Sequence, residues 1–231
     1  MELADAIKWY LVFLFSTSFH EAAHAWTAWK LGDDTAFRGG QATLDPTPHI
    51  RREPMGMVIV PIASYFIGGW MIGWASAPYN VAWALANPRR AGLMAIAGPA
   101  ANFTLVILAA IAIRLGVACH FFQAPASLGF MHMTDSVDGG LPEFVAKITS
   151  IFFSLNLLLG AFNLLPIPPL DGSSIPLLFS SPSAAEAIFR FMRQPAVRIA
   201  GMFIAWNFFG QVFRPILLFA GHLLYPGVFY Q

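Results

Sequence analysis

Apolar residues gather along the chain into five long stretches that are separated by short polar connectors. The stretches cover residues 3–31, 55–86, 90–117, 144–165 and 199–224. A helix needs about 20 mostly apolar residues to cross the hydrocarbon core of a bilayer. The pattern therefore predicts a chain built mainly from long membrane helices.

The second stretch differs from the others because glycines and prolines interrupt it. Pro61, Gly68, Gly69 and Pro78 lie within residues 55–86. We expect this segment to enter the membrane and return, with its turn near Gly68 and Gly69, and one ordinary span is the alternative. In the preceding connector, the polar residues after a glycine pair, Gly39–Asp45, predict a turn and a short strand. Residues 36–86 thus form a predicted strand and re-entrant region.

Composition supports a membrane protein. Hydrophobic residues make up 57% of the chain and charged residues 11%, well below the quarter that is usual for soluble proteins. The predicted fold is an all-α polytopic membrane protein with a short β-strand or re-entrant element and about 4–6 membrane segments. We expect one membrane-embedded domain over residues 1–231, in which residues 3–31 are a retained helix rather than a cleaved signal peptide.

Charge and cysteine content exclude some partners and some chemistry. The formal net charge is +1, which gives no basis for a nucleic-acid partner. Cys119 is the single cysteine of the sequence, so an internal disulfide is impossible. The expected surroundings are the lipid bilayer, and the sequence does not indicate an oligomeric state.

Residues 20–24 carry the strongest chemical signal, because they read His-Glu-Ala-Ala-His. His20 and His24 are four residues apart, so they lie on one helix face, where both imidazoles reach one metal ion. Glu21 beside them is placed to act as a general base toward water at that ion. Ionisable side chains within an apolar helix are costly and usually functional. A pair of interfacial histidines with a solvated glutamate is the structural alternative.

A catalytic zinc site usually has three protein ligands and one open position. Asp171 is the best candidate for the third ligand, because it follows a proline cluster that ends the fourth apolar stretch. Unwound backbone at membrane depth is tolerated where it is buried or lines a cavity. Capping of the following helix is the alternative role for Asp171. The remaining histidines are expected to be exposed or interfacial: His49, His120, His132 and His222.

Three motifs together resemble those of the site-2 proteases, which are intramembrane zinc metalloproteases. In order they are the His-Glu-Ala-Ala-His motif, Gly98-Pro99-Ala-Ala-Asn102, and the Asn-x-x-Pro-x-x-Pro-Leu-Asp-Gly pattern of residues 163–172. They fall in three of the five apolar stretches. The chain looks like the small subgroup that lacks a periplasmic peptide-binding domain and a nucleotide-sensing domain. One departure is Ser173-Ser174, where many relatives have glycine and a basic residue.

The resemblance implies a role for each matching residue. His20, His24 and Asp171 would bind one Zn²⁺ per chain, and Glu21 would be the catalytic base. Asn163 would help to hold the substrate or the oxyanion. Asn102 would be the family's asparagine of the third helix, with a catalytic role or, equally, a hydrogen bond that joins two helices.

Helix direction gives a separate check on these assignments. His20 and His24 lie late in the first stretch, and Asp171 lies just past the fourth, so both helices must run in the same direction for the ligands to meet. Residues 90–117 supply one crossing between them, so residues 55–86 must cross twice or not at all. Arginines on both flanks of that segment, such as Arg52 and Arg89, indicate that both flanks are cytoplasmic.

The resulting expectation is an integral, multi-pass protein of a bacterial inner membrane, with its active site towards the cytoplasmic side. Its function would be zinc-dependent cleavage of peptide bonds in or near transmembrane segments of membrane-protein substrates, as in regulated intramembrane proteolysis. A metal-ion transporter or metal-binding membrane protein is the alternative, since intramembrane His, Glu and Asp also mark ion pathways. A transporter would more often show repeated halves. An inactive relative that acts as a binding partner is the third hypothesis.

Overall fold

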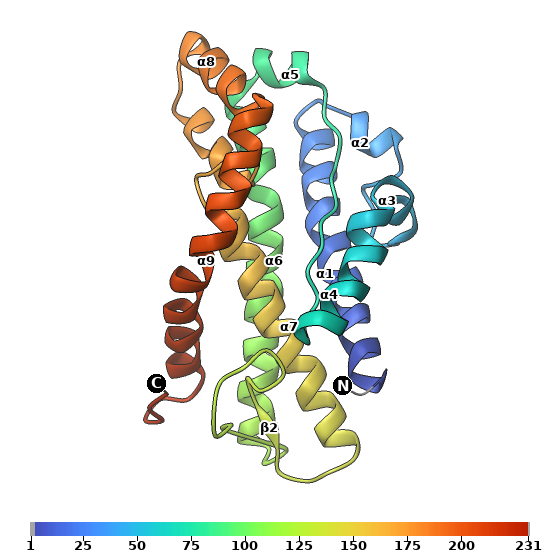
Figure 1. The fold of residues 1–231 in the computed structure, drawn as a ribbon, viewed down its shortest axis with the longest axis vertical. Helices are drawn as coiled ribbons and strands as arrows, with labels where there is room; N and C mark the ends of the chain where they lie inside the picture. The colour runs from blue at the N-terminus through green and yellow to red at the C-terminus, as the bar shows by residue number, and fades with distance from the viewer. Residues whose placement is uncertain (1–2, 231) are drawn as a thin grey trace.

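The computed structural model describes residues 3–230 as a bundle of long helices with short elements at both ends (Figure 1). Four long helices make up most of it: α1 (Leu3–Lys30), α6 (Pro88–Ala118), α7 (Leu141–Asn163) and α9 (Pro195–Leu224). Their bounds lie within four residues of the predicted stretches, which confirms the all-α membrane fold. α6 lies at the centre, where it packs against α1, α7 and the 3₁₀ helix η2 (Asp171–Leu178).

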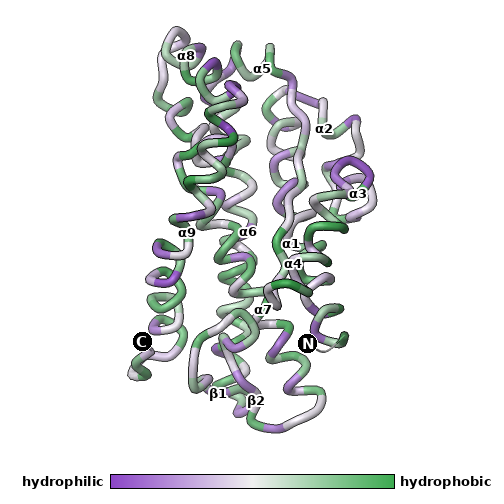
Figure 2. The backbone as a smooth tube through the Cα atoms, in the orientation of Figure 1, coloured by the Kyte–Doolittle hydropathy of each residue, from purple (hydrophilic) through white to green (hydrophobic). Residues whose placement is uncertain are grey.

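Three helices of the described chain are long and apolar enough to cross a bilayer, namely α6, α7 and α9. Helix α1 has 28 residues, but Lys8, the two histidines and Glu21 make it less apolar. These groups are buried against neighbouring helices, so a polar helix is tolerated here. Figure 2 shows hydrophilic residues in the upper part of α1, around α3 and near α8.

Helix directions agree with the geometric check made on the sequence. α1 and α7 both rise in the view of Figure 1, while α6 and α9 descend. The guanidinium of Arg90, at the start of α6, donates to the carbonyl oxygen of Leu31 just past α1, at 3.1 Å. The end of α1 and the start of α6 therefore lie at the same end of the bundle.

The segment between these helices forms a hairpin. Chain direction changes after the π-helix η1 (Met55–Ile59) and α4 (Val60–Gly68), where Gly69 has a positive φ of 76°. Residues 71–80, which form the returning arm of the hairpin, have no regular secondary structure. The Ser76 hydroxyl in this arm donates to the Glu53 carboxylate at 2.6 Å. Short α5 (Val81–Ala86) follows at the end of the bundle where α1 ends (Figure 1), and the Asn80 backbone N–H before it donates to the Asp33 carboxylate. The predicted turn at Gly68 and Gly69 is confirmed, and the chain path is not that of a single span.

The strand predicted within Gly39–Asp45 is wrong. Residues 39–46 form turns and bends between α2 (Thr35–Arg38) and α3 (Thr47–Arg52). The Asp45 carboxylate accepts a hydrogen bond from the Thr47 backbone N–H at 2.8 Å, which closes a turn, and hydrogen bonds from the Thr47 side chain and backbone lower the pKa of Asp45. A strand needs a partner, and none of the described residues pairs with this segment.

Strands occur instead at the opposite end of the bundle. β1 (Phe122–Gln123) pairs antiparallel with β2 (Asp135–Ser136) in the connector between α6 and α7. Phe130 in the same connector stacks on Trp70 at the hairpin turn, with ring centroids 5.4 Å apart. This stacking joins the tip of the hairpin to the loop below α7. Helix α8 (Pro182–Met192) connects η2 to α9.

The hairpin topology predicts the accessibility of single cysteines. In a Cys119→Ser background, cysteines placed at 52 and at 89 should both react with an impermeant maleimide from the same face of the membrane. Cys119 of the unaltered chain is exposed at the opposite end of α6 and is expected to react from the other face. Labelling of right-side-out and inverted vesicles would decide this. Positions 52 and 89 on opposite faces would contradict the hairpin.

Candidate metal centre

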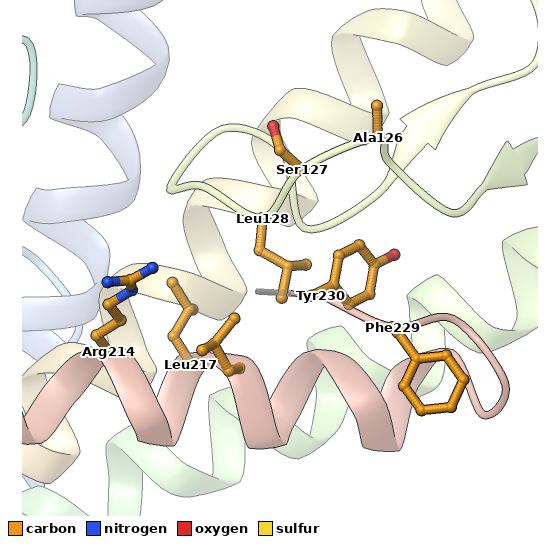
Figure 3. A pocket seen from close by; sticks show the side chains of 8 residues that line it. Ala126, Ser127, Leu128, Arg214, Leu217, Phe229 and Tyr230 are labelled. Atoms are coloured by element: carbon orange, nitrogen blue, oxygen red, sulfur yellow. The ribbon is translucent and has the colours of Figure 1, made fainter.

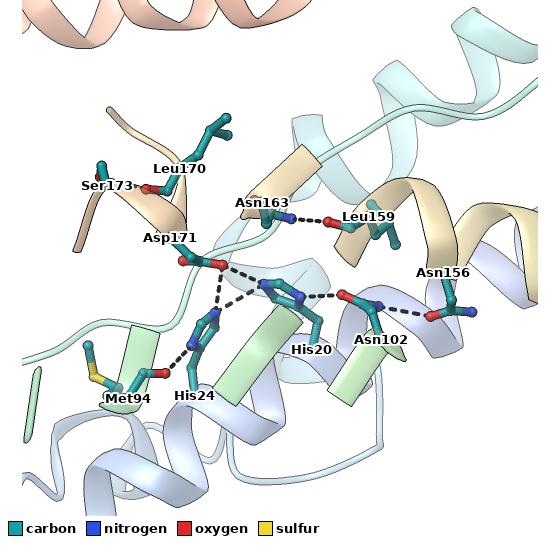
Figure 4. Close-up of polar contacts among 10 residues, drawn as sticks. All are labelled: His20, His24, Met94, Asn102, Asn156, Leu159, Asn163, Leu170, Asp171 and Ser173. Carbon is teal, nitrogen blue, oxygen red and sulfur yellow. Dashed lines mark hydrogen bonds and ion pairs between the residues drawn. The ribbon is translucent and has the colours of Figure 1, made fainter. Parts of the chain in front are cut away.

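Three side chains from two distant parts of the chain converge in the bundle (Figure 4). The Nε2 atoms of His20 and His24 are 3.0 Å apart, and the Oδ2 atom of Asp171 lies 3.1 Å from the first and 3.3 Å from the second. The two histidines are 6% and 7% exposed. The structure thus brings together the three residues predicted to be metal ligands.

The donor set fits a metal ion. Three tetrahedral ligands at about 2.0–2.1 Å from one zinc ion lie about 3.3–3.4 Å from one another. The observed separations of 3.0–3.3 Å are close to one face of such a tetrahedron. Within residues 3–230, no fourth His, Cys, Asp or Glu joins this group. Two imidazoles and one carboxylate are also the protein ligands of several catalytic zinc sites, which keep the fourth position open. Zinc therefore fits these residues.

Each histidine is oriented through its other ring nitrogen. The Nδ1 of His24 donates to the carbonyl oxygen of Met94 on α6, at 2.8 Å. The Nδ1 of His20 lies 2.6 Å from the Oδ1 of Asn102, also on α6. Hydrogen bonds at this position fix the ring and leave the opposite nitrogen for the metal. Asn102 therefore contacts a ligand histidine through the ring nitrogen that does not face the other ligands.

Gly98 allows the histidines to reach the backbone of α6. A β-carbon at this position would collide with the Nε2 atoms of both His20 and His24. The glycine of the Gly-Pro-Ala-Ala-Asn motif thus has a steric function that its sequence context alone did not specify. Its absence of a side chain leaves the space in which the ligand atoms meet.

Asp171 is presented by a tight turn. Pro166, Pro168 and Pro169 lie between the end of α7 and Asp171, which is the first residue of η2. A β-carbon at Gly172 would overlap the carbonyl oxygens of Leu164 and Leu165, so the Asp-Gly pair is required by the close return of the chain.

The residue that departs from the family pattern supports the same turn. Ser173 is buried, and its hydroxyl donates to the Leu170 carbonyl oxygen at 2.6 Å. That bond closes the turn on the residue directly before Asp171. Ser173 thus stabilises the position of the ligand in place of a glycine.

The other predicted residues lie near this centre in different ways. Glu21 follows His20 on α1 and is 7% exposed; within residues 3–230 it forms no hydrogen bond or ion pair. Asn163 ends α7, and its amide donates to the Leu159 carbonyl oxygen at 3.0 Å. His49 was expected to be exposed or interfacial, and that is wrong. It is fully buried, and its Nε2 bonds to the Thr43 carbonyl oxygen.

Sequence reasoning missed Asn156 and Ser16. Both are fully buried, and the Asn156 amide bonds to Asn102 and to the Ser16 hydroxyl. Two signals were available: Ser16 lies one helical turn before His20, and Asn156 is a polar residue inside an apolar helix.

A cavity of about 500 Å³ lies elsewhere, between the second half of α9, the loop near residue 127 and the C-terminal residues (Figure 3). Its lining residues are Ala126, Ser127, Leu128, Arg214, Leu217, Leu218, Phe229 and Tyr230. None of the three converging ligands borders it, so this cavity is separate from the metal centre.

The model of peptidase family M50 matches residues 9–206, which is most of the chain. The chain belongs to peptidase family M50. This family is that of the site-2 proteases, so the resemblance found in the motifs is confirmed. Together with the apolar helices, membership makes this M50 chain a membrane metalloprotease.

Two similar proteins have names that agree with this M50 assignment. "Putative zinc metalloprotease YwhC" of Bacillus subtilis is 41% identical over 170 residues, which cover 72% of this chain and 67% of that protein. "Putative zinc metalloprotease Rip2" of Mycobacterium tuberculosis is 33% identical over 159 residues, or 69% of this chain. The match spans 52% of the length of Rip2, about half of that relative. No match was found among the solved structures.

Gly98→Ala should weaken metal binding by this M50 chain. The added β-carbon would push apart the two histidine nitrogens, so we expect zinc affinity to fall by about 10-fold or more. Gly210→Ala is the matched control, because this glycine also lies in a long helix and has nothing within 4 Å of an added β-carbon. Zinc affinity of the purified chain, measured by competition with a chelator, checks both. Wild-type zinc affinity in Gly98→Ala would contradict the close approach.

Proposed function

We propose that this chain is a zinc-dependent endopeptidase that hydrolyses peptide bonds in or near transmembrane segments of membrane proteins. The observation that carries the proposal is the convergence of two imidazole nitrogens and one carboxylate oxygen inside a bundle of apolar helices. Family membership and the names of the relatives support zinc as the metal and peptide hydrolysis as the reaction.

His20, His24 and Asp171 would hold one zinc ion per chain. When bound, zinc supplies Lewis-acid chemistry, since it polarises a carbonyl oxygen and makes water a better nucleophile. The protein supplies the orientation of the ligands: Met94 and Asn102 fix the two rings, and the turn at Gly172 fixes the carboxylate.

Glu21 would be the general base. It precedes the second ligand by less than one helical turn and is nearly buried. Its carboxylate would take a proton from the attacking water and later deliver that proton to the leaving amine. A carboxylate held in a poorly hydrated site is well suited to both steps.

Asn163 would stabilise the oxyanion. Its amide nitrogen now donates to the Leu159 carbonyl oxygen within the same helix. Rotation of the side chain at this helix end would free that donor for the oxygen of the scissile carbonyl. Such donors contribute typically about 3–4 kcal/mol to the stabilisation of the transition state.

The cytoplasmic side of a bacterial inner membrane is the proposed location of the site. His24 lies six residues before the end of α1, which is about 9 Å along the helix axis. Basic residues of α2, of α8 and of the start of α6 lie at that end, while β2, which contains Asp135, lies at the other. The positive-inside rule favours a cytoplasmic position for the basic end.

A transmembrane helix would have to unwind at the site, because its backbone groups are satisfied internally and shield the peptide bonds. The substrate class is therefore a membrane protein with a locally unwound segment. Regulated intramembrane proteolysis, in which the supply of such a segment sets the timing, is the process that this arrangement would serve.

Glu21→Gln should abolish proteolysis and keep zinc. The amide has nearly the same shape but accepts no proton, so we expect turnover to fall by about 10²–10⁴-fold. Asp171→Ala removes a ligand and should lose zinc as well as activity. The measurement is co-expression with single-span membrane proteins, followed by detection of fragments, with zinc content determined in parallel. Full cleavage by Glu21→Gln would exclude the proposed role of Glu21, and zinc flux in vesicles without cleavage would favour a transporter.

Asn163→Ala is expected to lower turnover by about 10²–10³-fold, because one oxyanion donor is lost. The substrate KM should change little, since the donor acts mainly on the transition state. Kinetics on a cleaved single-span substrate in detergent would separate the two parameters. An unchanged turnover with a raised KM would assign Asn163 to substrate binding instead.

A further inference from the structure

A row of buried polar side chains runs from the metal centre through all three packed helices (Figure 4). His20 on α1 bonds to Asn102 on α6 at 2.6 Å, and the Asn102 Nδ2 donates to the Asn156 Oδ1 on α7 at 2.8 Å. The Asn156 Nδ2 donates to the Ser16 hydroxyl at 2.9 Å and to the Phe152 carbonyl oxygen at 2.8 Å. Asn102, Asn156 and Ser16 are fully buried.

The Phe152 carbonyl determines the direction of every bond in this row. A backbone carbonyl only accepts hydrogen bonds, so the atom of Asn156 that faces it must be the NH₂ group. The Asn156 oxygen then faces Asn102 and only accepts. Asn102 must therefore present its NH₂ group to Asn156 and its oxygen to His20.

We call this row of hydrogen bonds, from Asn156 through Asn102 to His20, the relay; it ends at the Nδ1 atom of His20. An amide oxygen only accepts, so the His20 Nδ1 must carry the proton of the neutral ring. Its Nε2 is then a bare nitrogen, directed at His24 and Asp171, as a metal ligand must be. His24 is set to the same tautomer directly, by the Met94 carbonyl.

We propose that Asn156 is a positioning residue of the zinc site, which fixes the orientation of the Asn102 amide and thereby the Nδ1-protonated tautomer of His20. The inference rests on the proposed function in so far as His20 binds zinc. Asn156 acts through Asn102 and has no contact with the ligand atoms. Without Asn156, the Asn102 amide is free to turn its NH₂ group toward His20, which would move the ring proton to Nε2 and block ligation.

Two substitutions in a double-mutant cycle test the relay. Asn156→Leu removes both polar atoms, and we expect zinc affinity to fall by about 10- to 100-fold. Asn102→Asp places a carboxylate beside His20, and both of its oxygens accept, so its orientation no longer matters. In the Asn102→Asp background, Asn156→Leu should therefore lower zinc affinity by less than about 2-fold. The carboxylate at position 102 presents an acceptor oxygen to His20 in either orientation, so Asn156 is no longer needed to orient it.

Ser16→Ala is the matched control. It removes a buried hydrogen bond of the same Asn156 amide and leaves the bond to the Phe152 carbonyl, so the polarity of the relay is unchanged. Zinc affinity should stay within about 2-fold of wild type, although stability falls. An equal loss of zinc affinity in Ser16→Ala and Asn156→Leu would show a general packing effect and would overturn the proposal.

The experiment uses the full chain in detergent with two readouts. Zinc affinity is measured by competition with a chelator, and ¹⁵N resonances of labelled histidine report the ring tautomer in the metal-free protein. We expect Nδ1–H for His20 in wild type and a mixture in Asn156→Leu. The same loss of zinc in both backgrounds, or wild-type zinc affinity and tautomer in Asn156→Leu, would overturn the relay. If Asn156→Leu does not fold, Asn156→Ala replaces it, and unfolding of both in each background would also overturn the proposal.

Failure of the proposed function has a different signature. One such result is that the wild type binds no stoichiometric zinc while Asn156→Leu changes the tautomer of His20. That result would support the relay and exclude the zinc enzyme. Equal zinc affinity of the wild type and of Asn156→Leu would be consistent with the proposed zinc enzyme and would exclude the relay.

Discussion

The arrangement of this protein depends on three electron-rich atoms that are held within 3.3 Å of one another: two imidazole nitrogens and a carboxylate oxygen. Such atoms repel when they are taken out of water, unless a cation or protons lie between them. The long helices bring them together at a place where both histidines are almost completely buried. The fold around them therefore holds three ligands in positions that suit a bound cation.

The three atoms can meet only because the chain approaches itself closely at two glycines. Gly98 lets the two histidines meet the surface of α6, and Gly172 lets the chain turn back beneath the end of α7. Helices in lipid gain little from hydrophobic attraction to one another, so small residues and hydrogen bonds between helices carry much of their packing. The same contacts that assemble the metal centre thus also hold α1 and η2 against α6.

Much of this was predictable from the sequence, for identifiable reasons. The long helices follow from long, mostly apolar runs, and the hairpin turn follows from Gly68 and Gly69. Asp171 could be found because prolines at membrane depth and a carboxylate both need an explanation. By contrast, the expected strand near residue 43 failed because strand formation depends on a partner that local pattern does not reveal. The burial of His49 likewise depends on the packing of the connector around it.

The row through Asn102 and Asn156 could not be predicted from spacing, because it depends on the rotation of three helices about their axes. Its chemistry nevertheless follows from one local fact: a helix carbonyl accepts and never donates. Asn156 lies four residues after Phe152 on the same helix face, so its amide reaches that carbonyl without help from other helices. A backbone group in α7 can in this way determine which nitrogen of a histidine in α1 is bare, through the amides of Asn156 and Asn102. Helix packing and ligand chemistry are then one constraint, because a bundle that packs correctly also holds its first ligand in the tautomer that leaves Nε2 bare.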